Sequence, residues 1–171
     1  MQNYYIQAAA KKARAGGGGG SPVDDYNHAY SDGDRTSIIT VTTDLASYGG
    51  PVSQLVDADF STNDSFFGGT VVDKEIRFQL LDGAAVFTEA TIHHNAYYTP
   101  HGYFKWQGSN NGSDWTDIGS SVQIQVNTSV TLTELNGNET AYTYYRLFGT
   151  SGNMNSNPYM RGFKFKVYRL E

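Results

Sequence analysis

The chain has 171 residues, of which 39% are hydrophobic, 14% aromatic and 17% charged, and its net charge is −5. This composition excludes a disordered chain, which needs more charge and fewer aromatic residues, and a coiled coil, which needs heptad repeats of Leu, Glu and Lys. The length suits one domain with a short appendage. With 19 glycines and 13 tyrosines, we expect a β-rich globular fold.

Several other classes of protein are excluded by what the sequence lacks. It has no cysteine, so disulfides, thiolate metal sites and cysteine nucleophiles are ruled out. No run of about 18 apolar residues occurs, and the N-terminus has no apolar core of a signal peptide, so we expect neither membrane insertion nor export by a signal peptide. The motifs G-x-S-x-G, H-E-x-x-H and the P-loop are missing, so we expect no enzyme.

The N-terminal segment differs from the rest of the chain. Residues 1–15 form a basic peptide rich in helix formers, residues 16–22 form a glycine-rich linker, and residues 23–171 form the body. Residues 1–20 carry a charge of +3, whereas residues 21–171 carry 9 bases and 17 acids, so we do not expect the body to bind nucleic acid. The peptide is either a frayed tail or a segment that becomes ordered when it docks on a partner.

Hydrophobic residues in the body repeat with a period of two, which predicts strands rather than helices. Clusters of Gly, Asn, Asp and Ser separate the apolar segments and predict turns. This pattern indicates an antiparallel β-sandwich or barrel. The expected strands cover residues 37–42, 70–80, 85–93, 102–108, 122–132, 141–148 and 163–168.

Five blocks of sequence, taken in order, carry a resemblance to a known family. They read LVDADFSTNDSFF, EIRFQL, GYFKWQGSNNGSDWTDIG, YYRLFGTSG and GFKFKVY, and they begin at residues 55, 75, 102, 144 and 162. Over about residues 50–168 the chain resembles the discoidin, or coagulation factor 5/8 type C, domain. The resemblance implies an all-β fold, an antiparallel jelly-roll β-sandwich of the galactose-binding-like type.

Both tryptophans lie in the third block. Phe104 and Trp106 share one face of the expected strand, so we expect both in the core. The Asn111-Gly112 pair predicts a tight turn that brings Trp115 back to the strand it left. We therefore expect Trp115 in the core, with a ligand platform as the alternative.

The segment from Asp57 to Asp64 is the densest cluster of oxygen ligands in the chain. It is not an EF-hand, because Thr62 stands where that loop requires glycine. The resemblance implies a structural calcium at this loop, with an acidic ligand from the last strand, but Gly162 stands at that position and Arg161 precedes it. The segment is thus either a weak calcium site of Asp57, Asp59 and Thr62 or a turn held by side-chain to backbone hydrogen bonds.

A second cluster, from residue 93 to residue 103, joins two expected strands and combines tyrosines with imidazole and amide groups. Flat rings beside polar side chains are typical of sugar recognition, although these tyrosines could equally cap the sandwich. A similar loop covers residues 152–159 and could lie at either end. A zinc site is poorly supported, because adjacent histidines on a strand point to opposite faces. The candidate ligand-binding residues are His94, Asn95, Tyr97, Tyr98, His101, Asn155 and Tyr159.

These features favour a noncatalytic carbohydrate-binding or display module. In this hypothesis residues 1–15 attach it to the proteins of a larger assembly, in which it oligomerises. We expect that assembly to be a phage virion, with the protein made in the host cytoplasm and serving as a fibre or decoration protein. The alternatives are a structural capsid cement or tail protein that binds no glycan, and an accessory carbohydrate-binding module of an enzyme.

Overall fold

The computed structural model describes residues 22–23, 33–47, 49–60, 65–94, 101–124, 129–154 and 159–170. The expected N-terminal peptide, residues 1–15, and most of the linker, residues 16–22, lie outside the described residues. No helix in the described part of the chain is long and apolar enough to cross a membrane.

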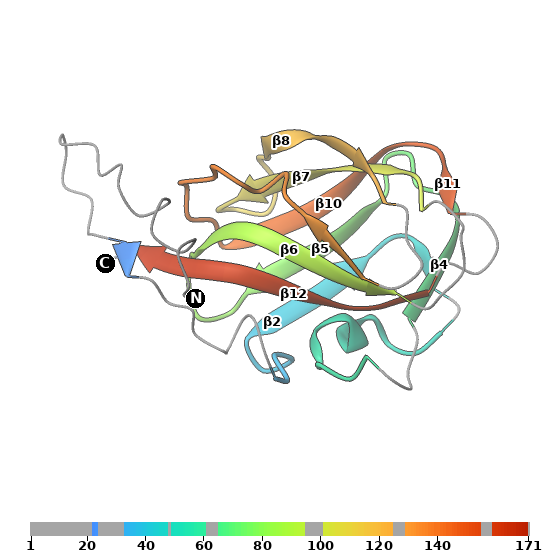
Figure 1. The fold of residues 1–171 in the computed structure, drawn as a ribbon, viewed down its shortest axis with the longest axis horizontal. Coiled ribbons are helices and arrows are strands. Elements are labelled where there is room, and N and C mark those ends of the chain that lie inside the picture. Colours follow the sequence, from blue (N-terminus) through green and yellow to red (C-terminus); the bar gives the residue numbers. More distant parts are fainter. Residues whose placement is uncertain are drawn as a thin grey trace, which may run out of the picture.

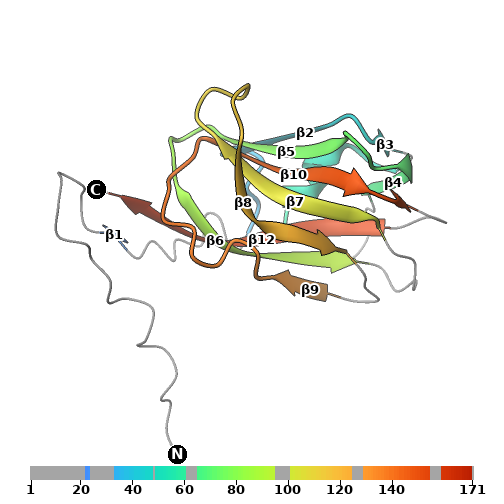
Figure 2. The same cartoon turned by 90° about the horizontal axis from the view of Figure 1, so that it is seen from above.

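The described chain forms two antiparallel sheets packed face to face (Figures 1 and 2). The expected all-β, antiparallel jelly-roll sandwich is confirmed. The seven-stranded sheet has the order β11-β4-β12-β6-β9, with β1 beside β12 and β3 beside β4. Its strands are β1 (Pro22–Val23), β3 (Ala46–Ser47), β4 (Ser65–Thr70), β6 (Val86–His94), β9 (Ser129–Leu132), β11 (Asn153–Met154) and β12 (Tyr159–Leu170).

The five-stranded sheet has the order β2-β5-β10-β7-β8. A short 3-10 helix, η1 (Val52–Val56), follows β3 and buries Leu55 and Val56. The strands of this sheet are β2 (Ile39–Thr43), β5 (Glu75–Leu80), β7 (Tyr103–Ser109), β8 (Thr116–Gln123) and β10 (Tyr144–Ser151).

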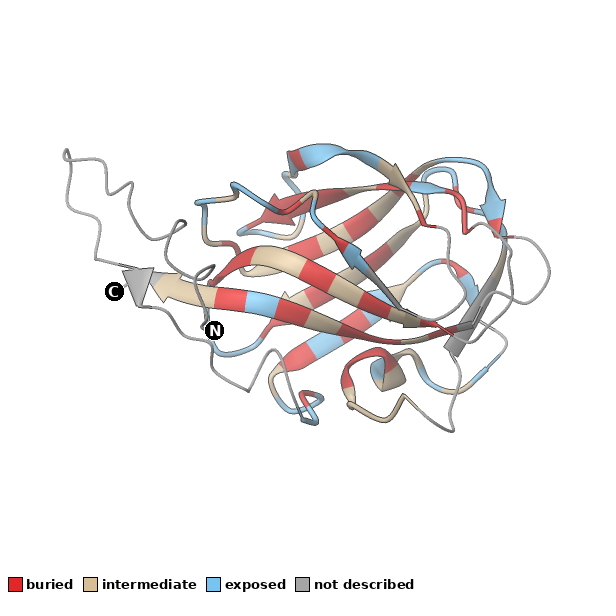
Figure 3. Cartoon of the chain, viewed as in Figure 1, coloured by how far each residue is buried: buried red, intermediate tan, exposed pale blue. Residues whose placement is uncertain are grey.

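The core lies between the sheets and follows the alternation of the sequence. Every second residue of β5 and β10 is buried, as the red bands on the strands in Figure 3 show. Trp106 is fully buried, which confirms its expected place in the core. Phe78 joins the two sheets, because its ring lies 5.0 Å from that of Phe163 and 5.1 Å from that of Phe165, both edge-on. Such edge-to-face contacts add to the free energy of burying the rings.

Two expected strands are interrupted, and β4 apart from Thr70 and β8 apart from residues 122–123 lie outside the ranges that the sequence predicted. Residues 70–80 are interrupted by a turn in which Asp73 has a φ of 58° and Lys74 N–H donates to the Val71 carbonyl. Residues 122–132 contribute the end of β8 and, after a break, β9, and these lie in different sheets. β1, β3 and β11 have two residues each, too few to produce a period-two pattern, and the sequence did not predict them.

The sandwich has two distinct ends. At one, which we call the terminal end, Pro22 of β1 pairs with Leu170 of β12. At the other, which we call the loop end, β6 finishes and β12 starts, with His94 and Met160 as register partners. Figure 1 shows the terminal end at the left and the loop end at the right, beside β4 and β11.

Candidate functional site

The two loops proposed for sugar recognition emerge from the same end of the sandwich. The first loop follows His94 and precedes His101, and the second ends at Met160, the register partner of His94. Gly102 and Gly152, which flank the two loops, also lie against each other, because a Cβ built on Gly152 would lie 3.3 Å from the Cα of Gly102. The strand register therefore places the bases of both loops at the same end of the sandwich.

The predicted ligand residues fall into two groups. His94 and His101 are described and buried, with exposed fractions of 6% and 1%, and a hydrogen bond of 2.9 Å joins His94 Nδ1 to His101 Nε2. Tyr159 is the first residue of β12, but its side chain is not among those that the structure describes. Asn95, Tyr97, Tyr98 and Asn155 lie outside the described residues, so their role in binding stays a prediction.

The backbone holds this end of the first loop rigidly. His101 N–H donates to the Ile124 carbonyl at 2.8 Å, and Ile124 N–H donates back to the Gly102 carbonyl at 3.1 Å. Gly102 has a φ of 84°, and a Cβ there would lie 2.6 Å from Val71 Cγ2, so only glycine fits. Together with the imidazole pair, these contacts fix where the loop leaves the sheet.

His93 contacts a different neighbour from His94. Its ring stacks on Phe60, with centroids 4.0 Å apart and planes 19° apart. Burial lowers the pKa of His93 below its usual value, and the charges of Lys164 and Arg35 lower it further. Within the described ranges, no three side chains of His, Asp or Glu are placed to hold a metal ion.

The loop proposed for calcium is held by other interactions. Asp57 Oδ1 accepts the backbone N–H of Asp59 at 2.9 Å, which is the turn hydrogen bond of the alternative interpretation. Burial raises the pKa of Asp57, although that hydrogen bond lowers it. Arg161 Nη1 donates to the Phe60 carbonyl at 3.1 Å, and a Cβ on Gly162 would overlap the Phe60 ring.

These described groups do not fit a calcium ion. A guanidinium group occupies one carbonyl of the loop, and an aromatic ring covers the position where the resemblance implies an acid. Hard cations need several anionic or carbonyl oxygens around one point. Thr62 lies outside the described residues, and weak calcium binding stays a prediction.

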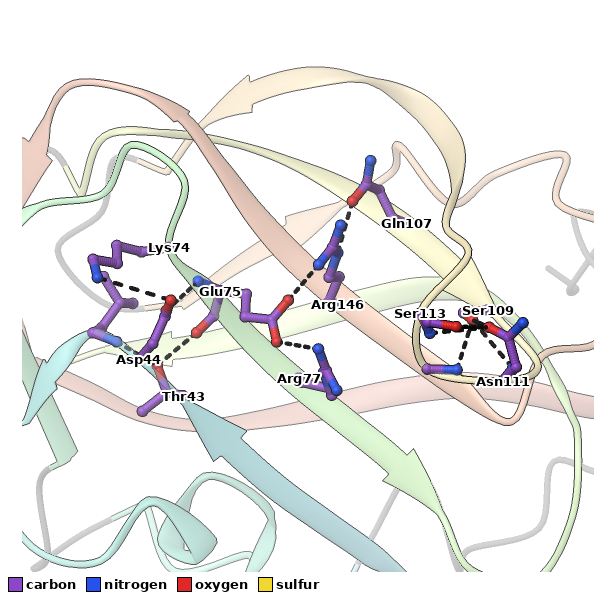
Figure 4. A network of polar contacts seen from close by, with 12 residues as sticks. Thr43, Asp44, Lys74, Glu75, Arg77, Gln107, Ser109, Asn111, Ser113 and Arg146 are labelled. Carbon is purple, nitrogen blue, oxygen red and sulfur yellow. Dashed lines mark hydrogen bonds and ion pairs between the residues drawn. The ribbon is translucent and has the colours of Figure 1, made fainter.

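A polar network crosses the outer face of the five-stranded sheet (Figure 4). Glu75 of β5 bridges two guanidinium groups, with 2.6 Å to Arg77 Nη2 and 2.5 Å to Arg146 Nη1. Arg146 Nε donates to Gln107 Oε1 at 2.7 Å. Gln107 Nε2 in turn donates to Asp117, and hydrogen bonds from Gln107 and from Lys105 hold the pKa of Asp117 below its usual value.

Trp115 lies on this outer face, and our expectation that it belongs to the core was wrong. The ring covers the guanidinium group of Arg146, 4.0 Å from its centroid, and that of Arg77, 5.1 Å away. The turn before it explains the position. Asn111 Oδ1 accepts the backbone N–H groups of Ser113 and Asp114, so the turn is closed by side-chain hydrogen bonds and projects Trp115 over the face of the sheet.

None of the residues of this network was among the functional residues predicted from the sequence. The alternation in β5 and β10 places Glu75, Arg77 and Arg146 on outward faces, and that signal was readable. The pairing of β5 with β10, which sets Arg77 opposite Arg146, joins segments about 70 residues apart and has no local signal.

Comparison with solved structures identifies the fold. The module CBM32-1 of a family 31 glycoside hydrolase from Clostridium perfringens superposes with a TM-score of 0.58 and 14% identity, over 75% of this chain and 93% of the module. The family 32 module of NanJ from C. perfringens, in complex with galactose, gives 0.57 and 13%, over 78% and 96%. The CBM32 of AlyQ, in complex with 4,5-unsaturated mannuronic acid, gives 0.53 and 18%, over 75% and 94%.

The chain therefore has the galactose-binding-like sandwich fold of discoidin domains, as the resemblance implied. Comparison with protein families and with curated proteins finds no match to the sequence.

Proposed function

We propose that the protein is a noncatalytic carbohydrate-binding module that holds its ligand at the loop end. Tyr97 and Tyr98 provide flat rings for the C–H face of a pyranose, while Asn95, Asn155 and Tyr159 provide hydrogen-bonding groups for its hydroxyls. The buried pair of His94 and His101 fixes the base of the first loop.

One observation carries the proposal: the sandwich superposes on carbohydrate-binding modules over about three quarters of the chain, two of them in complex with galactose or an unsaturated mannuronic acid. The position of the residues that flank the two loops adds to it, because they lie at one end of the sandwich and a sugar site needs rings and polar groups around one point.

A glycan array probed with the full chain tests the proposal. We expect binding to a restricted set of glycans, and loss of binding to at least one of them in the variants Tyr97→Ala and Tyr98→Ala. Both variants should melt at the temperature of the unaltered protein. If the array shows no binding, or if the variants bind every glycan as the unaltered protein does, the loop-end site is wrong.

We further propose that residues 1–15 attach the module to a virion, so that it is made in the host cytoplasm and displayed as a fibre or decoration protein. The support is the pairing of Pro22 with Leu170, which brings the N-terminal side of the body to the terminal end. An attachment there leaves the loop end facing outward.

Light scattering on the full chain and on a variant lacking residues 1–15 separates this proposal from its alternatives. A larger mass that depends on residues 1–15 supports attachment to an assembly. A monomer in both cases favours an accessory module of an enzyme. An oligomer that forms without residues 1–15, and that binds no glycan, favours a structural cement or tail protein.

A further inference from the structure

Aromatic side chains form a row along the outer face of the five-stranded sheet. Tyr144 and Phe148 lie on the outward side of β10, and Tyr103, on the neighbouring strand β7, is 41% exposed. Trp115 covers Arg146, which lies between Tyr144 and Phe148 on β10. The ring of Tyr144 packs beneath the turn, because a Cβ built on Gly112 would lie 3.5 Å from it. The part of the row left for a ligand therefore runs from Arg146 to Ser151, the register partner of Tyr103, about 17 Å at 3.3 Å per residue.

Trp115 is partly exposed, and two guanidinium groups contact its ring. Arg77 and Arg146 are register partners on adjacent strands, so both guanidinium groups contact the ring from the side of the sheet. Within the described chain, the two guanidinium groups are the only ring contacts of Trp115, and no hydrogen bond engages its Nε1–H. The indole thus offers a flat apolar surface with a hydrogen-bond donor at its edge.

The cations around the row are all paired with carboxylates. Lys74 pairs with Asp44, Lys105 with Asp117, and Arg77 and Arg146 with Glu75. Asp114 accepts a hydrogen bond from the Asn111 amide. A neutral ligand therefore suits the face better than an anionic one, because no unpaired cation among its described residues is available to attract an anion.

The network also holds the platform in place. Arg146 is bound through Nη1 to Glu75 and through Nε to Gln107, so the guanidinium group beneath Trp115 is fixed in position. A ring held in this way loses little freedom when a ligand stacks on it, and pre-organisation of this kind raises affinity.

We propose that the outer face of the five-stranded sheet is a second binding site, for a neutral glycan chain laid along β10. One pyranose stacks on Trp115, and further units contact Phe148 and Tyr103. Pyranoses have C–H faces and hydroxyl edges, which match a row of rings flanked by amide and hydroxyl groups. The site is separate from the loop end and stands whether or not the loop end binds a sugar.

Tryptophan fluorescence of the full chain gives a direct test, because the chain has two tryptophans and Trp106 is fully buried. The probes are cellohexaose, mannohexaose and xylohexaose, with hexagalacturonate as the charged comparator. We expect at least one neutral hexaose to change the emission saturably, and hexagalacturonate to have no effect. No response to any neutral hexaose, or tighter binding of hexagalacturonate, would overturn the proposal.

Calorimetry with the hexaose that responds measures the contribution of each ring. Trp115→Ala should weaken binding at least tenfold and Tyr103→Ala about threefold, whereas Thr40→Ala, an exposed position on the edge strand β2, should bind normally. Tyr103 is exposed, so its variant keeps the test decisive if Trp115→Ala fails to fold.

A double variant, Tyr97→Ala with Tyr98→Ala, separates this site from the loop end. It should keep the affinity for the hexaose. If the double variant loses that affinity and Trp115→Ala keeps it, the face proposal is overturned and the loop-end proposal stands. A concentration-dependent dimer that Trp115→Ala abolishes would instead assign the face to a second copy of the chain, and would also overturn the proposal.

Discussion

Replacing Glu75 by Gln should destabilise the protein more than any other single change on the outer face of the five-stranded sheet. Glu75 accepts two charged contacts, and the side chains of Glu75 and Arg146 are only 16% and 14% exposed. At an effective dielectric constant of about 20, the Coulomb attraction between two unit charges about 4 Å apart is about 4 kcal/mol, before the cost of desolvating them is subtracted. Glutamine is neutral and turns an NH₂ group toward one of the two guanidinium groups.

The expected loss in the free energy of unfolding lies between the loss for an exposed ion pair, up to about 1 kcal/mol, and the loss for a fully buried ion pair, about 3–5 kcal/mol. We therefore expect about 2–3 kcal/mol. For a domain of this size, that lowers the melting temperature by about 5–10 °C. Calorimetric melting of the unaltered chain and of Glu75→Gln at low ionic strength measures the shift.

Asp44→Asn is the matched control for this prediction. Asp44 and Lys74 form a looser pair of 3.9 Å whose side chains are 49% and 40% exposed, and asparagine keeps the acceptor for the backbone N–H of Glu75. We expect a loss below about 1 kcal/mol. Equal shifts in the two variants, or no shift in Glu75→Gln, would refute the reasoning that the network is a fixed part of the fold.

Four further predictions concern the core, pH, calcium and the N-terminal peptide. Trp106→Ala should lower the free energy of unfolding by about 3–5 kcal/mol, because the ring is fully buried, whereas Trp115→Ala should lower it by about 1 kcal/mol. Denaturant unfolding of the two variants measures the difference. The folded protein holds His93 neutral, so the stability that this group contributes is complete above the unfolded pKa of 6.5 and is lost as the pH falls below it. His93→Gln should therefore reduce the fall in melting temperature between about pH 7.5 and pH 5.5, and an unchanged fall would exclude His93 as its cause. Calcium added to chelator-treated protein should bind no tighter than about 10⁻⁴ M at the Asp57 loop, and micromolar binding would contradict the poor donor set. Removing residues 1–15 should change the melting temperature by less than about 5 °C, because a glycine linker transmits little packing, and a larger fall would show that the peptide packs on the body.

The sequence predicted the parts of the fold that have a local signal. The alternation in EIRFQL and YYRLFGT predicted strands, and the structure buries every second residue of both, including Phe78 and Leu147. The Asn111-Gly112 turn also lies where the sequence predicted it, between β7 and β8. A short stretch of sequence is enough to predict such elements, because hydrophobic periodicity and turn-forming residues are local properties.

Trp115 shows where such reasoning fails. A tight turn returns the chain to its strand, but the turn does not determine which face of the sheet the next side chain covers. That depends on the hydrogen bonds of Asn111 within the turn and on the two arginines beneath the ring. The arginines come from strands whose pairing only the assembled sheet reveals, so the network and the aromatic row could not be predicted from the sequence.

The most direct test of the account is to locate the sugar on the protein. Amide chemical shifts of the isotope-labelled full chain can be followed during titration with the sugar that gives the strongest array signal. The account predicts saturable shifts at the loop end, in residues 93–103 and 152–160. Shifts confined to the turns at the terminal end, residues 110–114 and 136–141, or no saturable shift at all, would contradict it.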